Sequence, residues 1–96
     1  MLTEKTINIL KEKAKAYNVK RLLLFGSCLN MSEEEANDID LAVEGIYGDS
    51  FFAFHSELML DDDINKSIDL IDMSRNATIM PVILETGVVI YESSSY

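Results

Sequence analysis

Three aspartates lie in short apolar segments, where charged residues are uncommon and indicate a possible functional site. Asp38 and Asp40 flank Ile39, and Asp69 lies between two apolar residues of a later segment. Side chains two residues apart on a strand leave the same face, so Asp38 and Asp40 project together. Clustered carboxylates repel one another by about 1 kcal/mol or more per pair, even when partly solvated. Hard divalent cations relieve this repulsion, so the pattern predicts a Mg²⁺ or Mn²⁺ site that substrate phosphate oxygens complete.

A glycine–serine pair precedes the aspartates. Gly26 and Ser27 follow the apolar run that ends at Phe25, and ten residues separate Ser27 from Asp38. A glycine lets the backbone approach a phosphate closely, and the serine hydroxyl and neighbouring N–H groups can donate hydrogen bonds to it. Gly-Ser after a strand is a weak signal alone. Followed by ten residues and Asp-x-Asp on the next strand, it predicts nucleotide binding at Gly26 and Ser27.

The periodicity of apolar residues predicts the elements that position these side chains. The predicted order is a helix over 4–17, a strand over 19–25, a helical turn opening at 26, a strand over 39–43, a helix over 51–60, a strand over 67–72, a helix over 75–86, a strand over 88–91 and a polar tail over 92–96. Thr3, Asp49 or Ser50, and Ser74 are the predicted helix caps, and Gly87 is the predicted stop of the last helix. This order indicates one compact α/β or α+β domain spanning residues 1–96.

Length and charge narrow the class of protein. The chain has 96 residues, 48% of them apolar, and a formal net charge of −9. The apolar content supports a packed core and excludes a disordered acidic tail. The acidity argues against direct binding of duplex nucleic acid and of anionic membranes, because both require a basic surface. The acidity favours binding of metal ions or of a basic protein partner. The sequence also allows the chain to form a homodimer.

Cysteine usage and the N-terminus indicate the compartment. Cys28 is the single cysteine, which excludes an internal disulfide and a cysteine-based zinc site and suits a reducing environment. The first residues do not resemble a signal peptide, and no apolar run approaches the roughly 20 residues of a membrane span. We therefore expect a cytoplasmic protein.

The combined motifs resemble a known family. Leu24-Phe25-Gly26-Ser27, ten residues and then Asp38-Ile39-Asp40-Leu41 is similar to the signature of the minimal nucleotidyltransferase domain of the DNA polymerase beta superfamily. Ile68-Asp69-Leu70-Ile71-Asp72 resembles the strand that carries the third carboxylate of the family. The resemblance covers nearly the whole chain. It implies a polymerase-beta-like α/β (α+β) fold, with a mixed sheet of about four strands and helices packed against it.

The resemblance also implies an activity and a role for each residue. It implies metal-dependent transfer of a nucleotidyl group, AMP from ATP, to a hydroxyl, with two Mg²⁺ ions or Mn²⁺ in their place. Gly26 and Ser27 would hold the triphosphate. Asp38, Asp40 and Asp69 would be the catalytic metal ligands, with Asp40 bridging both ions and Asp69 nearest the attacking hydroxyl. Many such domains resemble antitoxins of HEPN-type toxins, which implies a HEPN-type partner that receives the AMP.

One departure from the family pattern leaves a second hypothesis open. The family often carries a basic residue just after its Gly-Ser, whereas residues 28–37 of this chain hold three glutamates and no cation. The 44 residues between Arg21 and Lys66 contain 11 acids and no lysine or arginine. The alternative to the enzyme is therefore a catalytically weak antitoxin, a binding module that neutralises a basic toxin by complex formation.

Overall fold

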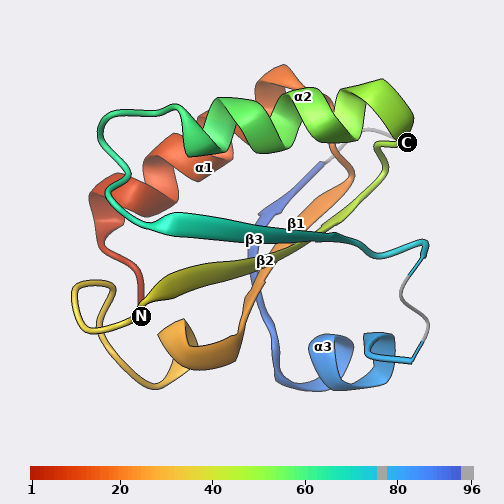
Figure 1. The fold of residues 1–96 in the computed structure, drawn as a ribbon. Coiled ribbons are helices and arrows are strands. Elements are labelled where there is room, and N and C mark those ends of the chain that lie inside the picture. The colour runs from red at the N-terminus through yellow and green to blue at the C-terminus, as the bar shows by residue number, and fades with distance from the viewer. Residues whose placement is uncertain (76–77, 94–96) are drawn as a thin grey trace.

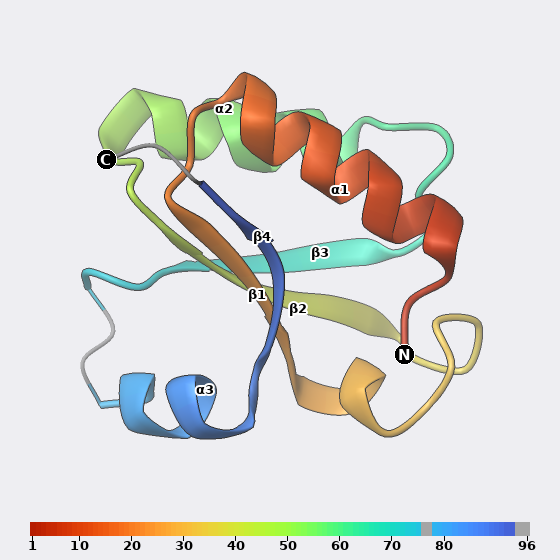
Figure 2. The same cartoon turned by 180° about the vertical axis from the view of Figure 1, so that it is seen from behind.

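The computed structural model describes residues 1–75 and 78–93, and the elements in this part of the chain alternate as the sequence predicts (Figures 1 and 2). They are α1 (Glu4–Ala16), β1 (Arg21–Phe25), the 3₁₀ turn η1 (Gly26–Leu29), β2 (Asp38–Glu44), α2 (Gly48–Met59), β3 (Ser67–Asp72), α3 (Met80–Thr86) and β4 (Val88–Glu92). The Thr3 hydroxyl caps α1 by accepting the Thr6 N–H at 3.2 Å, as predicted.

The four strands form one mixed sheet in the order β3-β2-β1-β4. β1 pairs antiparallel with both β2 and β4, whereas β2 and β3 are parallel. A parallel pair needs a crossover connection, which α2 supplies. The predicted mixed sheet with helices packed against it is thus confirmed.

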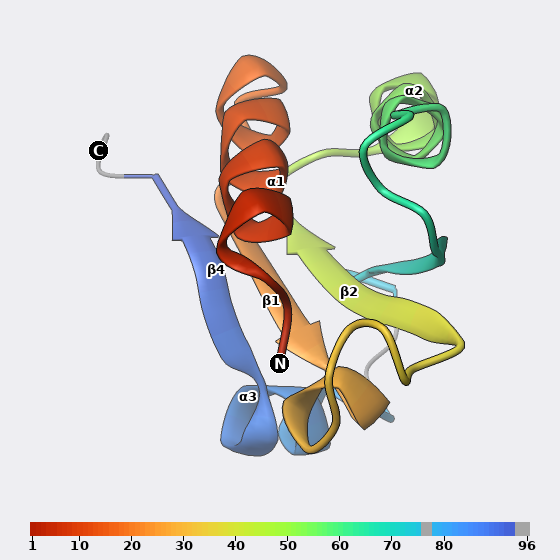
Figure 3. The same cartoon turned by 90° about the vertical axis from the view of Figure 1, so that its left-hand side faces the viewer.

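The two faces of the sheet are covered unequally (Figure 3). α1 and α2 cover one face, where Leu10, Phe54 and Leu58 are fully buried against the strands. The other face has a much smaller core, in which Ile83 of α3 packs with Leu23 and other residues of the sheet. A large part of this second face is therefore left for polar side chains, and we call it the open face.

The outer edge of β3 is protected by side chains of α2. The ring Nε2 of His55 lies 2.7 Å from the Ile68 carbonyl oxygen, and the Ile68 N–H donates to the sulfur of Met59 at 3.3 Å. These contacts satisfy backbone groups that an edge strand otherwise presents to other chains. His55 is therefore a half-buried structural residue.

Some predicted boundaries were wrong. β1 begins at Arg21, because Asn18 adopts a φ of 55° and the Val19 N–H bonds back to the Ala14 carbonyl oxygen, which keeps Val19 in the turn that ends α1. The residue that precedes α2 is Tyr47, and it provides no side-chain cap, so neither Asp49 nor Ser50 has that role.

The start of α3 was also predicted wrongly. α3 begins at Met80, and Ser74 does not cap it. Ser74 instead donates its N–H and its hydroxyl to the Asp72 carboxylate, at 2.9 and 2.7 Å, in the turn that follows β3. Residues 76–77 of the predicted helix and 94–96 of the predicted tail lie outside the described part of the chain.

Candidate active site

Asp40 and Asp69 are neighbours across the parallel pair of strands. Asp40 is the register partner of Asp69. Asp38 is the register partner of Ser67, two residues earlier on each strand. Paired residues of adjacent strands project to the same face. All three aspartates alternate with residues of the main core, so they project from the open face, away from α1 and α2.

Gly26 closes this cluster from the side of β1. Phe25, the last residue of β1, pairs with Asp40, and Gly26 follows with a φ of +77°. A Cβ atom built on Gly26 would lie 2.2 Å from an Asp40 carboxylate oxygen, a distance that no side chain tolerates. The backbone angle favours glycine, and a larger residue here would force the Asp40 side chain to move. Gly26 of the predicted nucleotide-binding pair and Asp40 of the predicted metal ligands are thus brought together.

The pKa of Asp40 is raised by burial and in part because neighbouring carboxylates repel its negative charge. Burial raises the pKa of Asp40 most, followed by repulsion from Asp69, a hydrogen bond with Asp69 that favours protonated Asp40, and the charge of Asp38. Asp69 is therefore the neighbour that perturbs Asp40 most, and Asp38 has a smaller effect through its charge. A raised carboxylate pKa that arises from burial and like charges is typical of functional sites.

Asp38 does not form a ready three-carboxylate metal site with Asp40 and Asp69. Asp38 and Asp69 are exposed and Asp40 is half-buried. Within the described ranges, no three acidic, histidine or cysteine side chains are grouped tightly enough to hold an ion as they stand. The donor set fits a hard divalent cation chemically, because Asp40 and Asp69 already share a space that repulsion makes unfavourable without positive charge.

η1 is anchored to the start of β2 through Cys28. Cys28 is fully buried, and its thiol lies 3.6 Å from the Asp38 carbonyl oxygen. Burial is the main cause that raises the pKa of the Cys28 thiol. The thiol is therefore held neutral, which does not suit a nucleophile. Cys28 has a packing role: it fixes the turn that carries Gly26 and Ser27 against the strand that carries the aspartates.

Two of the three glutamates between η1 and β2 have side-chain hydrogen bonds within the described part of the chain. Glu33 accepts hydrogen bonds from the Thr3 N–H at 3.0 Å and from the hydroxyls of Thr3 and Thr6, at 3.2 and 2.9 Å. Its charge is thus placed at the N-terminus of α1, where a negative charge is favourable. Glu35 accepts from the Ser32 hydroxyl at 2.9 Å. The sequence shows these acids but not this fixation, because the partners of Glu33 lie 27 and 30 residues away.

Two further residues near the cluster were not singled out by sequence reasoning. Ser67 is the register partner of Asp38, so its exposed hydroxyl lies beside that carboxylate on the open face. The preceding residue, Lys66, donates from its ammonium group to the Glu34 carbonyl oxygen at 2.8 Å. The relevant signal in the sequence is position, because Lys66 is the first cation after Arg21 and directly precedes the strand of Asp69.

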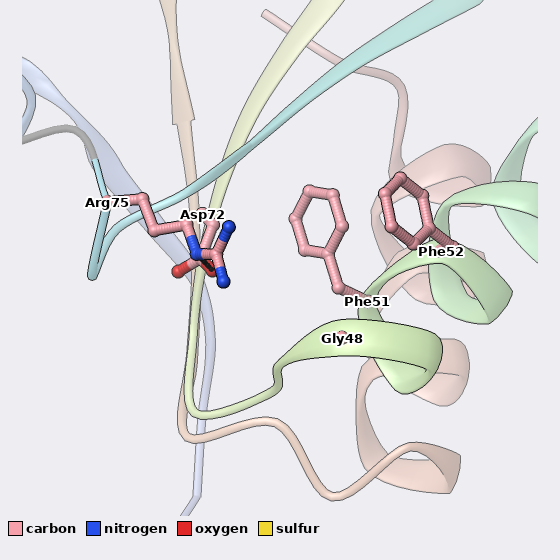
Figure 4. A pocket seen from close by; sticks show the side chains of 5 residues that line it. All are labelled: Gly48, Phe51, Phe52, Asp72 and Arg75. Carbon is pink, nitrogen blue, oxygen red and sulfur yellow. Dashed lines mark ion pairs between the residues drawn. The ribbon is translucent and has the colours of Figure 1, made fainter.

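A separate cavity of about 170 Å³ lies at the other end of β3 (Figure 4). Gly48, Phe51 and Phe52 of α2 line it together with Asp72 and Arg75. The buried acid that lines this cavity, Asp72, already has protein partners. It accepts two hydrogen bonds from Ser74 and lies 3.9 Å from the Arg75 guanidinium. The cavity contains none of the predicted site residues, so the aspartates of the open face remain the candidate site. No helix among the described residues is both long and apolar enough to cross a bilayer.

Comparison with known proteins connects this geometry to a family. The family model described as polymerase beta, nucleotidyltransferase matches residues 4–96. The match therefore includes Gly26, Ser27 and all three aspartates. No curated protein sequence matches the chain.

Solved structures share the fold at low sequence identity. A crystal structure of the toxin–antitoxin MntA-HepT superposes with a TM-score of 0.68 at 15% identity, covering 95% of this chain and 74% of that chain. A tri-AMPylated Shewanella oneidensis HEPN toxin in complex with MNT antitoxin gives 0.68 at 17% identity, covering 94% and 72%. A toxin–antitoxin structure with AMP-PNP gives 0.66 at 17% identity, covering 96% and 76%. At these identities the likeness is one of fold.

Proposed function

The chain belongs to the polymerase beta nucleotidyltransferase family, and from this premise we propose that it is an antitoxin that transfers AMP from ATP to a hydroxyl of a HEPN-type partner. The observation that carries the proposal is the contact of three predicted site residues. Asp40 is paired with Asp69 across the sheet, and Gly26 lies against the Asp40 carboxylate. This arrangement supports a site in which a triphosphate at Gly26 lies directly beside two carboxylates.

Each residue has a distinct proposed task. The missing side chain of Gly26 lets the turn pack directly against the Asp40 carboxylate, so that a triphosphate held at this turn lies beside the metal ligands, and Ser27, which is exposed, donates its hydroxyl to a phosphate oxygen. Asp38, Asp40 and Asp69 hold divalent cations, Mg²⁺ or Mn²⁺, with Asp40 placed between the other two. When bound, two such ions supply positive charge that stabilises the attacking and leaving oxygens of an in-line displacement.

The reaction then depends mainly on positioning. Asp69 orients the acceptor hydroxyl and helps take its proton as the new bond from oxygen to the α-phosphorus forms. The bond from the α-phosphorus to the bridging oxygen breaks, and pyrophosphate leaves. In transfers of this kind the protein contributes alignment and charge stabilisation more than covalent chemistry.

The fixed loop supports an active enzyme over a weak one. A triphosphate that approached free glutamates after Ser27 would be repelled. Glu33 instead bonds to the start of α1, and Glu35 bonds to Ser32. Two of the three glutamates in the segment that departs from the family pattern are thus held in fixed positions by local hydrogen bonds.

The partner is proposed from the structural neighbours and from charge. All three of the similar folds reported above come from toxin–antitoxin structures, and the toxin of one of them is a tri-AMPylated HEPN toxin. The net charge of −9 complements a basic partner. A HEPN-type protein that carries the acceptor hydroxyl fits both observations.

A transfer assay tests the proposal. The chain is mixed with the HEPN-type protein encoded beside it, with Mg²⁺ and with ATP labelled in the α-phosphate. We expect labelled partner with the wild type and with Asp62→Asn, a control that removes an exposed carboxylate whose neighbours Asp61 and Asp63 pair with lysines of α1. Asp40→Asn and Asp69→Asn should give none. Equal labelling by Asp40→Asn would remove the proposed site.

The second candidate, a catalytically weak antitoxin that neutralises a basic toxin by binding, is favoured by the acidic balance of the chain. Eleven acids and no lysine or arginine lie between Arg21 and Lys66. Protection against the toxin that survives Asp40→Asn, with no modified toxin detected by mass spectrometry, would establish this function. Protection that requires Asp40 and ATP would establish the enzyme.

A further inference from the structure

Positive charge is scarce in the part of the chain that forms the candidate active site. The 44 residues between Arg21 and Lys66 contain 11 acids and no lysine or arginine, and they include η1 and two of the three site aspartates. A triphosphate carries several negative charges, so an acidic site repels it unless cations offset the repulsion. A lysine or arginine from outside this stretch can therefore raise the affinity for a nucleotide only if the fold brings it back toward η1.

Most of the lysines and arginines are paired with carboxylates elsewhere. Five of the eight form ion pairs, at N···O distances of 2.7–4.0 Å. These five are Lys5, Lys13, Lys20, Arg21 and Arg75. Among the described residues, no carboxylate lies within that distance of the other three, which are Lys11, Lys15 and Lys66. Lys11 and Lys15 are exposed on α1, whereas Lys66 is half-buried, so solvent screens the charge of Lys66 only in part.

A hydrogen bond holds the Lys66 ammonium group against the segment between η1 and β2. The group donates to the Glu34 carbonyl oxygen at 2.8 Å, across 32 residues of sequence. This bond uses one of the three ammonium donors, and its acceptor is neutral, so the positive charge is kept. Lys66 also directly precedes Ser67, the register partner of Asp38. The ammonium group is thus fixed near the point where β2 and β3 begin.

The charge of Lys66 acts at η1. Burial is the main cause that raises the pKa of the Cys28 thiol in this turn, and the charge of Asp40 raises it further. The ammonium groups of Met1 and Lys66 lower it. At the turn that carries Gly26 and Ser27, Lys66 therefore opposes the negative charge of a site aspartate.

We propose that Lys66 determines the affinity for the nucleotide, because its ammonium group, held by the Glu34 carbonyl oxygen, offsets part of the negative charge that phosphates meet at η1. The identity of the ligand, a nucleoside triphosphate, rests on the proposed function. The position of the charge rests on the hydrogen bond, on the partial burial of Lys66 and on its effect at η1. Lys66 acts through its charge and does not touch the reacting atoms, so it is not a catalytic residue.

Loss of this charge should weaken nucleotide binding without slowing the transfer. We expect Lys66→Met to bind the non-hydrolysable analogue AMP-PNP about three- to tenfold more weakly, because one unit charge acts here through a partly aqueous medium. The difference should shrink as salt rises from about 0.1 M to about 1 M, since the Debye length falls from about 10 Å to about 3 Å. In the transfer assay the KM for ATP should rise by a similar factor, and kcat should stay unchanged.

Calorimetry with AMP-PNP and saturating Mg²⁺, on the full chain, tests the proposal. Lys66→Arg keeps the charge and should bind like the wild type. Lys66→Gln keeps a hydrogen-bond donor without the charge and should lose as much affinity as Lys66→Met. Lys11→Met is the matched control, because it changes the net charge by the same amount at an exposed position of α1, in the helical layer opposite the aspartates (Figure 3). Its binding should be unchanged.

Each outcome decides the proposal. Wild-type affinity in Lys66→Met overturns it, and so do equal losses in Lys66→Met and Lys11→Met. Wild-type affinity in Lys66→Gln also overturns it, because the hydrogen bond and not the charge would then matter, and so does a loss that is the same at both salt concentrations. If Lys66→Met melts at a lower temperature, Lys66→Gln and the salt dependence still report the charge.

The same measurements separate this proposal from the proposed function. AMP transfer by the wild type, with unchanged affinity in Lys66→Met, would refute the role of Lys66 alone. Affinity that Lys66→Met lowers, without any AMP transfer by the wild type, would refute the proposed function and support the role of Lys66. No binding of AMP-PNP by the wild type would refute both.

Discussion

Substitution of Asp40 by asparagine should stabilise the metal-free protein. The asparagine keeps the size of the side chain, and its amide can donate a hydrogen bond to Asp69. It removes the charge whose pKa is raised by burial, by Asp69 and by Asp38. The change therefore removes a repulsion that the folded state contains and the unfolded chain does not.

The magnitude follows from the geometry of the pair. Two like charges about 4 Å apart interact by about 1 kcal/mol in a water-like dielectric and by several times that value when desolvated. Asp40 is half-buried and Asp69 is exposed, so the lower value applies. For a domain of this size, about 1 kcal/mol corresponds to a rise of roughly 4–8 °C in melting temperature.

The pH dependence has a definite sign. Because the folded state holds Asp40 with a pKa above its ordinary value of 3.8, the penalty is complete above the raised pKa. It disappears as the pH falls through the raised pKa toward 3.8. The advantage of Asp40→Asn should therefore be largest near neutral pH and absent near pH 3.8.

Thermal denaturation followed by circular dichroism, in EDTA and across this pH range, measures the effect. Asp62→Asn is the control and should match the wild type at every pH. Added Mg²⁺ should raise the melting temperature of the wild type more than that of Asp40→Asn. A variant that melts no higher than the wild type near neutral pH, or whose advantage persists unchanged in acid, would refute the reasoning.

Three other substitutions give distinct results. Gly26→Ala should abolish AMP transfer and lower the melting temperature, because its Cβ would collide with the Asp40 carboxylate; transfer at the wild-type rate in a radiolabel assay would contradict this. Ser27→Ala should weaken ATP affinity several-fold in calorimetry without changing the melting temperature, and an unchanged affinity would exclude the hydroxyl contact. Glu33→Gln should lower stability in urea by about 1 kcal/mol, through loss of charge at the start of α1, and leave transfer intact. Faster transfer by this variant would mean that Glu33 repels the substrate after all.

The strands and the first helix could be predicted because their signals are local. β3 begins and ends where the alternation of Ile68 and Leu70 places it, and Thr3 caps α1 as predicted. The start of α3 could not be predicted. Ser74 is a favourable cap by type, but the Asp72 carboxylate takes both of its donors in a turn. The preference of Ser74 for a helix cap was therefore overridden by its hydrogen bonds to Asp72, two residues earlier.

The candidate site was only partly predictable. The sequence places Asp38 and Asp40 on one face, but the contact with Asp69 depends on the register of a parallel pair that α2 connects. The collision between a Gly26 Cβ atom and Asp40 depends likewise on how β1 pairs with β2. These are long-range consequences of packing, which no periodicity in one segment determines.

In the proposed site the aspartates hold divalent cations beside a bound nucleotide. Electron paramagnetic resonance of Mn²⁺, titrated into the chain with a non-hydrolysable ATP analogue, tests it most directly. We predict bound Mn²⁺ with the wild type and with Asp62→Asn, and its loss with the double substitution Asp38→Asn/Asp40→Asn. Undiminished Mn²⁺ binding by the double variant would contradict the account.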